Sequence, residues 1–190
     1  RIDAQIRYYA DLCRGDSACS ARTADLAESM RRVSRAMPAR WLVFPIRADK
    51  VKLAAFAMLF HRDTAAMVFD AFLAADRGDA SGLVMLSAAA DLVLPNLGVW
   101  GDFFSKGYSA DFDPARDYDA ELAPPDSIMG SPFSQVLWNS DSSWPTPLID
   151  EDLRRAQPSD VETLLVSGSV DFSTPAEAAT EDLLPLLHHG

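Results

Sequence analysis

The sequence has 190 residues, of which 48% are hydrophobic and 24% charged, and this is the composition of a soluble globular protein of about one domain. Its formal net charge of −11 at pH 7 argues against nucleic acid or an anionic membrane as a partner, because binding to either requires a positive protein surface. No apolar run approaches the ~18 residues needed to cross a bilayer, so no membrane span is expected.

Residues 1–95 are expected to form a helical unit. Apolar residues recur at helical spacing through this region, beginning with Ile2 and Ile6 on one face of the first predicted helix. Thr23 is a suitable N-cap for the second helix, whereas the segment 41–46 is too short to assign. The predicted helices cover approximately residues 2–13, 23–37, 49–60, 63–78 and 80–94.

Cys13 and Cys19 are the two cysteines, and their spacing matches no zinc-binding pattern. One interpretation is a short disulfide loop, which implies an oxidising compartment and therefore export. The other is a pair of reduced thiols that flank a turn. Gly15 and Asp16 between them make a tight turn easy to form, which favours the disulfide. Such a bond would be structural and not catalytic.

Residues 96–160 are expected to be ordered but irregular. Prolines at this density interrupt helices and strands alike. Those prolines are Pro114, Pro124, Pro125, Pro132, Pro145, Pro147 and Pro158. The segment also holds more aromatic residues than a disordered linker contains, namely Trp100, Phe103, Phe104, Phe133, Trp138 and Trp144. We therefore expect a connection that wraps on a surface, with short helical turns.

The segment 163–168 is short, apolar and uncharged, as in a parallel strand that is buried on both faces. A helix is predicted to follow it. Thr174 and Glu177 match a capping box, and Pro175 suits the first helical position because it has no N–H group to satisfy. This helix is expected to run toward Leu187.

The predicted fold class is α/β, with one parallel strand and helix of a core sheet after a mostly helical region. A buried strand needs neighbours on both sides, and the chain offers no convincing partner for it. Either WLVF (41–44) and fragments of the middle segment pair with it, or the sheet lies outside the sequence, and we favour the second alternative. The chain begins with Arg1 rather than Met, which also favours a processed protein or a piece of a longer one. The expected divisions are 1–95, 96–160 and 161–190.

Asp171 follows the predicted strand directly, at its carboxyl end. In open α/β sheets functional residues gather at that edge. A carboxylate there can hold a histidine in the correct tautomer and stabilise its imidazolium during acyl transfer. The structural alternative is a loop aspartate that caps its own turn by accepting hydrogen bonds from nearby N–H groups.

The stretch TLLVSGSVDFSTPAEAATEDLLPLL resembles the acid-bearing segment of α/β-hydrolases, in particular the tripeptidyl-aminopeptidase and proline-iminopeptidase-like group. Its specific motif occupies about 165–175. The stretch YYADLCRGDSACS is similar to the cysteine-containing segment after the nucleophile strand, and the helices to about 95 resemble the lid. The resemblance implies a partial α/β-hydrolase fold, with Asp171 as the triad acid and a small peptide, amide or ester as substrate. It implies no metal or organic cofactor.

The rest of the catalytic machinery is missing from the sequence. Such enzymes carry the nucleophile in a Gly-x-Ser-x-Gly elbow, with the triad order Ser, acid, His, and no such elbow occurs here. The closest stretches, GDASG and SGSVD, do not match it. His188 and His189 come too early to be the triad base, and His61 lies between two predicted helices. The chain is therefore expected to be an inactive fragment of an exo-acting serine peptidase that needs a core with Ser and His.

Two further questions stay open at the level of the sequence. Lid carboxylates of relatives bind the ammonium group at a substrate's N-terminus, and four residues here are candidates for that role: Asp102, Asp111, Asp113 and Glu121. Their alternative role is a solvated acidic face. For the whole chain, the alternatives to a hydrolase fragment are a helical binding module, which would present aromatic residues of 100–108, and a catalytically dead hydrolase relative.

Overall fold

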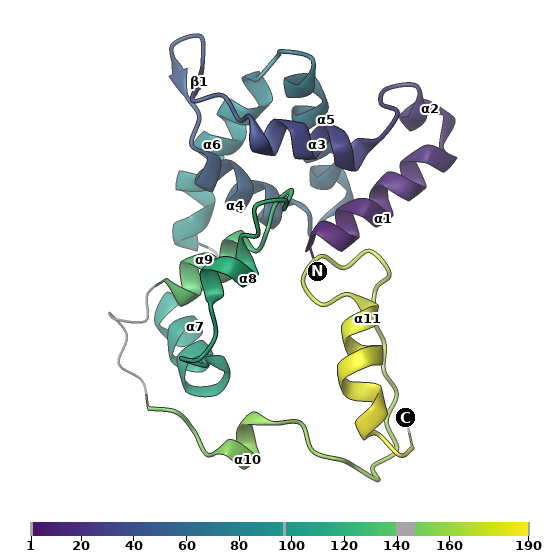
Figure 1. The fold of residues 1–190 in the computed structure, drawn as a ribbon, viewed down its shortest axis with the longest axis vertical. Coiled ribbons are helices and arrows are strands. Elements are labelled where there is room, and N and C mark those ends of the chain that lie inside the picture. Colours follow the sequence, from purple (N-terminus) through teal and green to yellow (C-terminus); the bar gives the residue numbers. More distant parts are fainter. Residues whose placement is uncertain (1, 97, 140–146, 190) are drawn as a thin grey trace.

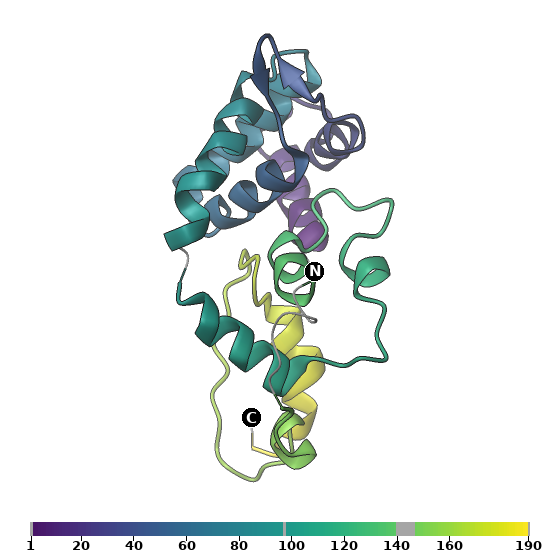
Figure 2. The ribbon, with the colours of Figure 1, turned by 90° about the vertical axis from the view of Figure 1, so that its left-hand side faces the viewer.

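The protein is described by a computed structural model that covers residues 2–96, 98–139 and 147–189. It is mostly helical, at 60%, and the part of the chain that is described contains one two-stranded antiparallel sheet. Figures 1 and 2 show the first helices gathered at one end of the molecule and the C-terminal segment at the other. The helix-rich character agrees with the sequence prediction.

The N-terminal helices form a bundle around a shared core (Figure 1). They are α1 (Ile2–Gly15), α2 (Ser17–Ser20), α3 (Leu26–Arg35), α4 (Ala48–Met58), α5 (Arg62–Asp76) and α6 (Ser81–Val93). Helices α4 and α5 both pack on α6, and α3 packs on α1 and α5. Met30, Phe72 and Leu83 are fully buried at the centre. We refer to residues 2–93 as the helical unit.

The helix predicted over residues 23–37 is α3, and its N-cap residue differs from the predicted one. Asp25 is the N-cap of α3, and its carboxylate accepts a hydrogen bond from the Glu28 N–H at 2.9 Å. The hydroxyl of Thr23 instead accepts from the Asp25 N–H at 3.2 Å and shares a hydrogen bond with the Ser29 hydroxyl at 3.0 Å. The Thr23 prediction was wrong because a stronger capping residue lies two positions later, adjacent to the first helical turn.

The unassigned segment 41–46 belongs to a hairpin. Strand β1 (Arg40–Trp41) pairs antiparallel with β2 (Phe44–Pro45). Leu42 in the turn has a φ of 52°, in the left-handed region that side chains other than glycine rarely adopt. Two-residue strands give little periodic signal, which is why the sequence pattern did not reveal them.

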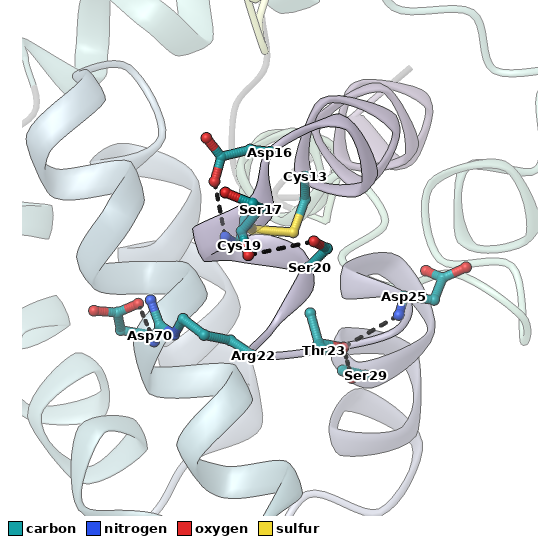
Figure 3. Close-up of a disulfide and its surroundings, with 10 residues drawn as sticks. All are labelled: Cys13, Asp16, Ser17, Cys19, Ser20, Arg22, Thr23, Asp25, Ser29 and Asp70. Atoms are coloured by element: carbon teal, nitrogen blue, oxygen red, sulfur yellow. Dashed lines mark hydrogen bonds and ion pairs between the residues drawn. A yellow bond between two sulfur atoms is a disulfide. The ribbon is translucent and has the colours of Figure 1, made fainter.

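Cys13 and Cys19 are joined by a disulfide, with their Cα atoms 5.1 Å apart (Figure 3). Asp16 lies between them and caps the short helix α2, which contains Cys19, and its carboxylate accepts from the Cys19 N–H at 2.8 Å. Arg22, just beyond, pairs with Asp70 of α5 at 2.7 Å. The disulfide thus closes the turn that leads from α1 toward α3.

Removal of this disulfide is expected to destabilise the helical unit by about 2 kcal/mol, the chain-entropy cost of opening so short a loop. The double variant Cys13→Ala, Cys19→Ala should show this loss in urea unfolding, and dithiothreitol should produce the same loss in the unmodified chain. Dithiothreitol should leave the double variant unchanged, which is the control. Equal midpoints for the oxidised and reduced chain would contradict the prediction.

The connection after the helical unit consists of short helical turns, as expected. These are η1 (Leu94–Asn96), α7 (Trp100–Lys106), the π-helix η2 (Gly107–Asp111), α8 (Tyr118–Leu122), α9 (Pro132–Trp138) and α10 (Glu151–Arg154). Both carboxylate oxygens of Asp3 accept hydrogen bonds from this connection, at 2.6 Å from the Ile128 N–H and 2.9 Å from the Met129 N–H. Ile128 and Met129 are buried against the helical unit. Trp144, also predicted to be part of this ordered connection, lies outside the described residues.

The predicted strand 163–168 is extended but is not part of a sheet. Leu164 and Val166 are each 86% exposed, so the described residues bury neither side chain. The physical reason is that the described residues provide no strands to cover or pair with the segment. At its start the Thr163 N–H donates to the His189 carbonyl at 3.0 Å, and just before it a parallel bridge joins Ser159 and Leu187.

The C-terminal helix lies alongside this extended segment (Figure 1). It comprises α11 (Ala176–Ala178), the π-helix η4 (Ala179–Leu183) and the 3-10 turn η5 (Leu184–Leu186). Pro175 is its N-cap residue and forms no side-chain cap hydrogen bond. The predicted capping box is therefore wrong, because the Thr174 hydroxyl donates to Asp171 at 2.9 Å instead.

Within the described ranges, no helix is both long enough and apolar enough to cross a membrane.

Candidate functional site

Asp171 lies in the loop that joins the extended segment to the C-terminal helix, and three hydrogen bonds hold its carboxylate. One oxygen, Oδ1, accepts from the N–H groups of Ser173 at 2.8 Å and Thr174 at 3.0 Å. The other, Oδ2, accepts from the Thr174 hydroxyl at 2.9 Å. These are the bonds of an aspartate that caps its own turn. A carboxylate has about four acceptor positions, so Oδ2 retains capacity for one more donor.

The same bonds favour the charged form of the carboxyl group. The Thr174 N–H, followed by the Ser173 N–H and the Thr174 hydroxyl, lowers the pKa of Asp171 below its ordinary value of 3.8, although partial burial acts in the opposite direction. The Asp171 carboxylate is therefore ionised and fixed in direction at neutral pH, as orientation of an imidazole requires.

Replacement of Thr174 by valine is expected to raise the pKa of Asp171 toward 3.8, because one donor to the carboxylate is lost. Since the folded pKa lies below the unfolded one, the stabilisation of this loop is present above about pH 4 and is lost as the pH falls through the folded pKa. The titration is followed by the ¹³C shift of the Asp171 carboxyl carbon. Ser173→Ala is the matched control, since Ser173 donates through its backbone. An unchanged pKa in Thr174→Val would contradict the prediction.

Phe172 attaches the acid loop to the helical unit. Its side chain is 1% exposed and belongs to the core of that unit. The ring stacks on Tyr9 of α1 at a centroid distance of 5.3 Å, and Tyr9 in turn contacts Phe69 of α5 at 5.1 Å. Burial raises the pKa of the Tyr9 phenol. Phe172 thus anchors the loop of Asp171 to helices α1 and α5.

Three backbone hydrogen bonds join residues 159–163 to residues 186–189. The Ser159 N–H donates to the Leu186 carbonyl at 2.8 Å, and the His188 N–H donates to the Ser159 carbonyl at 3.0 Å. The Thr163 N–H donates to the His189 carbonyl at 3.0 Å. The resulting bridge is parallel, as between strands joined by a crossover helix. Asp171 lies beyond the carboxyl end of the first segment, where such units carry their functional residues.

The histidines do not meet the acid in the part of the chain that the structure describes. His188 pairs through Nδ1 with Asp160 at 2.6 Å, and both side chains are largely exposed. His189 contributes its backbone carbonyl to Thr163. His61 is exposed at the start of α5. Among the described residues, none of the three histidine rings is bonded to the Asp171 carboxylate.

Most of the carboxylates considered for ammonium binding have local partners. Asp102 pairs with Lys106 one turn later at 2.7 Å, and Asp113 accepts from the Ala115 N–H at 2.9 Å. Glu121 forms a two-nitrogen ion pair with Arg116, which lowers the pKa of Glu121 below its ordinary value. Asp111 is exposed at the end of η2. These contacts give the four residues no shared direction toward the Asp171 loop.

An aromatic cavity of about 250 Å³ borders the acid loop, and no sequence pattern indicated it. Its lining residues come from four separate parts of the chain: Phe56, Ala57, Phe60, Phe103, Phe133 and Ser173. Aromatic residues at 56–60, 103 and 133 carry no signal that they share a site, because only the packing of α4, α7 and α9 brings them together. We call this space the phenylalanine cavity.

The described residues contain no group of three or more histidine, cysteine, aspartate or glutamate side chains placed to hold a metal ion. Comparisons of the chain with models of protein families, with curated proteins and with solved structures found no match.

Proposed function

We propose that this chain is the lid and acid-bearing segment of a serine hydrolase, with Asp171 as the acid of the catalytic triad. The observation that carries the proposal is the Asp171 loop itself: an ionised carboxylate follows an extended segment, precedes the C-terminal helix and is joined to the helical unit through Phe172. By resemblance, the parent enzyme is an exo-acting peptidase that removes short peptides from an N-terminus, or cleaves a related small amide or ester.

The chemistry assigned to this chain is limited to one step. Asp171 accepts the Nδ1–H of a histidine, which holds the ring so that Nε2 can take the proton of the serine hydroxyl. The carboxylate then stabilises the imidazolium that forms, and the same histidine returns the proton to the leaving amine. Because serine and histidine come from elsewhere in the parent, the chain alone is expected to show no acyl transfer.

The order of the triad sets an expected position for that histidine. It follows the acid after a further helix and strand, about 25–35 residues after Asp171, which corresponds to about positions 196–206. The parallel bridge between Ser159 and Leu187 is consistent with such a strand next to the segment 163–168. The exposed Leu164 and Val166 are interpreted as side chains that other parts of the parent enzyme cover.

The test is the coding sequence on both sides of this segment. A Gly-x-Ser-x-Gly elbow upstream and a histidine at about positions 196–206 would support the proposal. An elbow whose serine is replaced would indicate a hydrolase relative without catalysis. Stop codons close to both ends would overturn the proposal. A fluorophosphonate probe is the companion measurement: it should label a serine of the whole protein stoichiometrically and should leave this chain unlabelled.

A helical binding module is the second candidate, because the helical unit buries a core of its own that includes Met30, Val68 and Phe72. In that case Asp171 is only the cap of its turn. The flanking sequence distinguishes the two candidates.

A further inference from the structure

The phenylalanine cavity lies directly beside the proposed acid. Ser173 forms part of its lining, and the N–H of the same residue donates to Asp171 Oδ1 at 2.8 Å. The remaining lining is apolar and comes from α4, the turn after it, α7 and α9. A ligand in the cavity would therefore contact Ser173, which belongs to the loop that holds the Asp171 carboxylate.

The walls of the cavity are phenyl rings that already support one another. Phe56 contacts Phe60 edge-on at 5.2 Å and stacks with Phe133 at 6.1 Å. Phe103 contacts Phe133 edge-on at 5.4 Å. Phe60 and Phe103 are 51% and 41% exposed, so two of the four rings still present apolar surface to solvent. Aromatic pairs prefer these offset and edge-on arrangements, and a further ring can join them.

The size of the cavity matches a single side chain. A cavity of about 150 Å³ lined by apolar residues holds a benzene ring, whereas pockets for whole drug-sized ligands begin at about 300 Å³. At about 250 Å³, the cavity has room for one aromatic or branched aliphatic side chain. Its lining among the described residues holds no charged side chain, so a lysine or glutamate side chain would lose its hydration without compensation.

We propose that the phenylalanine cavity binds one uncharged, apolar side chain of the substrate, either aromatic or branched aliphatic. This assignment rests on the proposed function. In a triad, two hydrogen bonds, the width of the imidazole ring and an attack distance of about 3 Å place the scissile carbonyl on the order of 10 Å from the acid. A substrate side chain next to that carbonyl can reach a cavity whose lining residue is bonded to Asp171.

The experiment measures binding to this chain directly, without catalysis. N-acetyl-L-phenylalaninamide, N-acetyl-L-leucinamide, N-acetyl-L-lysinamide and N-acetylglycinamide are titrated into the ¹⁵N-labelled protein. The first two are expected to bind with a Kd on the order of 1–10 mM and to shift the amide signals of Ala57, Phe133 and Ser173. The lysine and glycine compounds are expected to bind at least about tenfold more weakly.

Variants locate the binding. Ala57→Phe fills the cavity and is expected to raise the Kd of N-acetyl-L-phenylalaninamide at least about tenfold. Ala66→Phe, on the exposed face of α5, is the matched control and should leave the Kd unchanged. Ser173→Phe blocks the same space from an exposed loop position, so it tests the assignment even if Ala57→Phe fails to fold.

Three results would overturn the assignment. The first is equal binding of the glycine and phenylalanine compounds, and the second is an unchanged Kd in Ser173→Phe. The third is a set of ligand-induced shifts confined to another apolar surface, such as the groove lined by Met58, Met67 and Met85. Failure of binding leaves the flanking-sequence test of the hydrolase untouched, and absence of the elbow or the histidine leaves the binding result standing. The two failures are therefore distinguishable.

Discussion

If the proposed function is correct, replacement of Asp171 by asparagine in the proposed parent hydrolase is expected to lower kcat by about 10⁴-fold, because an amide no longer holds the histidine in the tautomer that can accept the serine proton. The loop should keep its shape. The asparagine Oδ1 can still accept from the N–H groups of Ser173 and Thr174, which now hold the carboxylate. KM should change little, since the substituted group does not touch the substrate. Steady-state kinetics on a chromogenic peptide or ester substrate measure both constants.

Asp160→Asn is the matched control for that substitution. Asp160 is an exposed carboxylate of the same region and pairs with His188, so its loss removes a charge near the C-terminal helix without removing the proposed acid. Its kcat is expected to stay within about twofold of the unmodified enzyme, as a surface ion pair contributes little. If Asp171→Asn retains full kcat, Asp171 is a turn cap and the triad assignment is wrong.

Replacement of Phe172 by alanine is expected to release the acid loop from the helical unit. The ring is 1% exposed and stacked on Tyr9, and deletion of a buried phenylalanine ring costs about 3–5 kcal/mol. A loss of 3 kcal/mol corresponds to an open population of the loop more than about a hundredfold larger. Hydrogen exchange at the amides of Ser173 and Thr174 measures it, because both are held by Asp171 in the closed loop.

Val170→Ala is the control for Phe172→Ala, as Val170 lies in the same loop but is 41% exposed. Phe172→Leu should give an intermediate effect, since it keeps an apolar side chain of smaller volume in the core. Unchanged exchange in Phe172→Ala would mean that the loop is held by its own hydrogen bonds. The interpretation that Phe172 fixes the Asp171 loop to the helical unit would then be wrong.

The positions of the helices could be predicted because their signals are local. Apolar spacing between Ile2 and Cys13 follows the helical repeat, and Gly78, with a φ of 98°, ends α5 where a left-handed residue is needed. The N-cap of α3 was predicted wrongly because two neighbouring residues compete for that role. Asp25 and Thr23 can both cap a helix, and the choice depends on which side chain reaches the first free N–H groups.

The strand could not be predicted in the same way. An apolar run such as 163–168 is a strand only if other strands pair with it, and the partners are a property of the whole sheet. Thr174 shows the same dependence at the scale of one hydroxyl, which bonds to Asp171 rather than capping the helix. The sequence pattern correctly indicated a loop with a carboxylate, but not what that carboxylate would bind.

The sequence by itself determined the helical character of the first half, the irregular connection, the proximity of the two cysteines and the place of Asp171 between an extended segment and a helix. Each of these depends on residues within a few positions of one another. Only the tertiary structure decided that Phe172 is buried against Tyr9, that the bridge from Ser159 is parallel, and that four phenylalanines enclose a cavity beside Ser173. Such contacts join residues far apart in the chain, and their free energy depends on packing that no local pattern encodes.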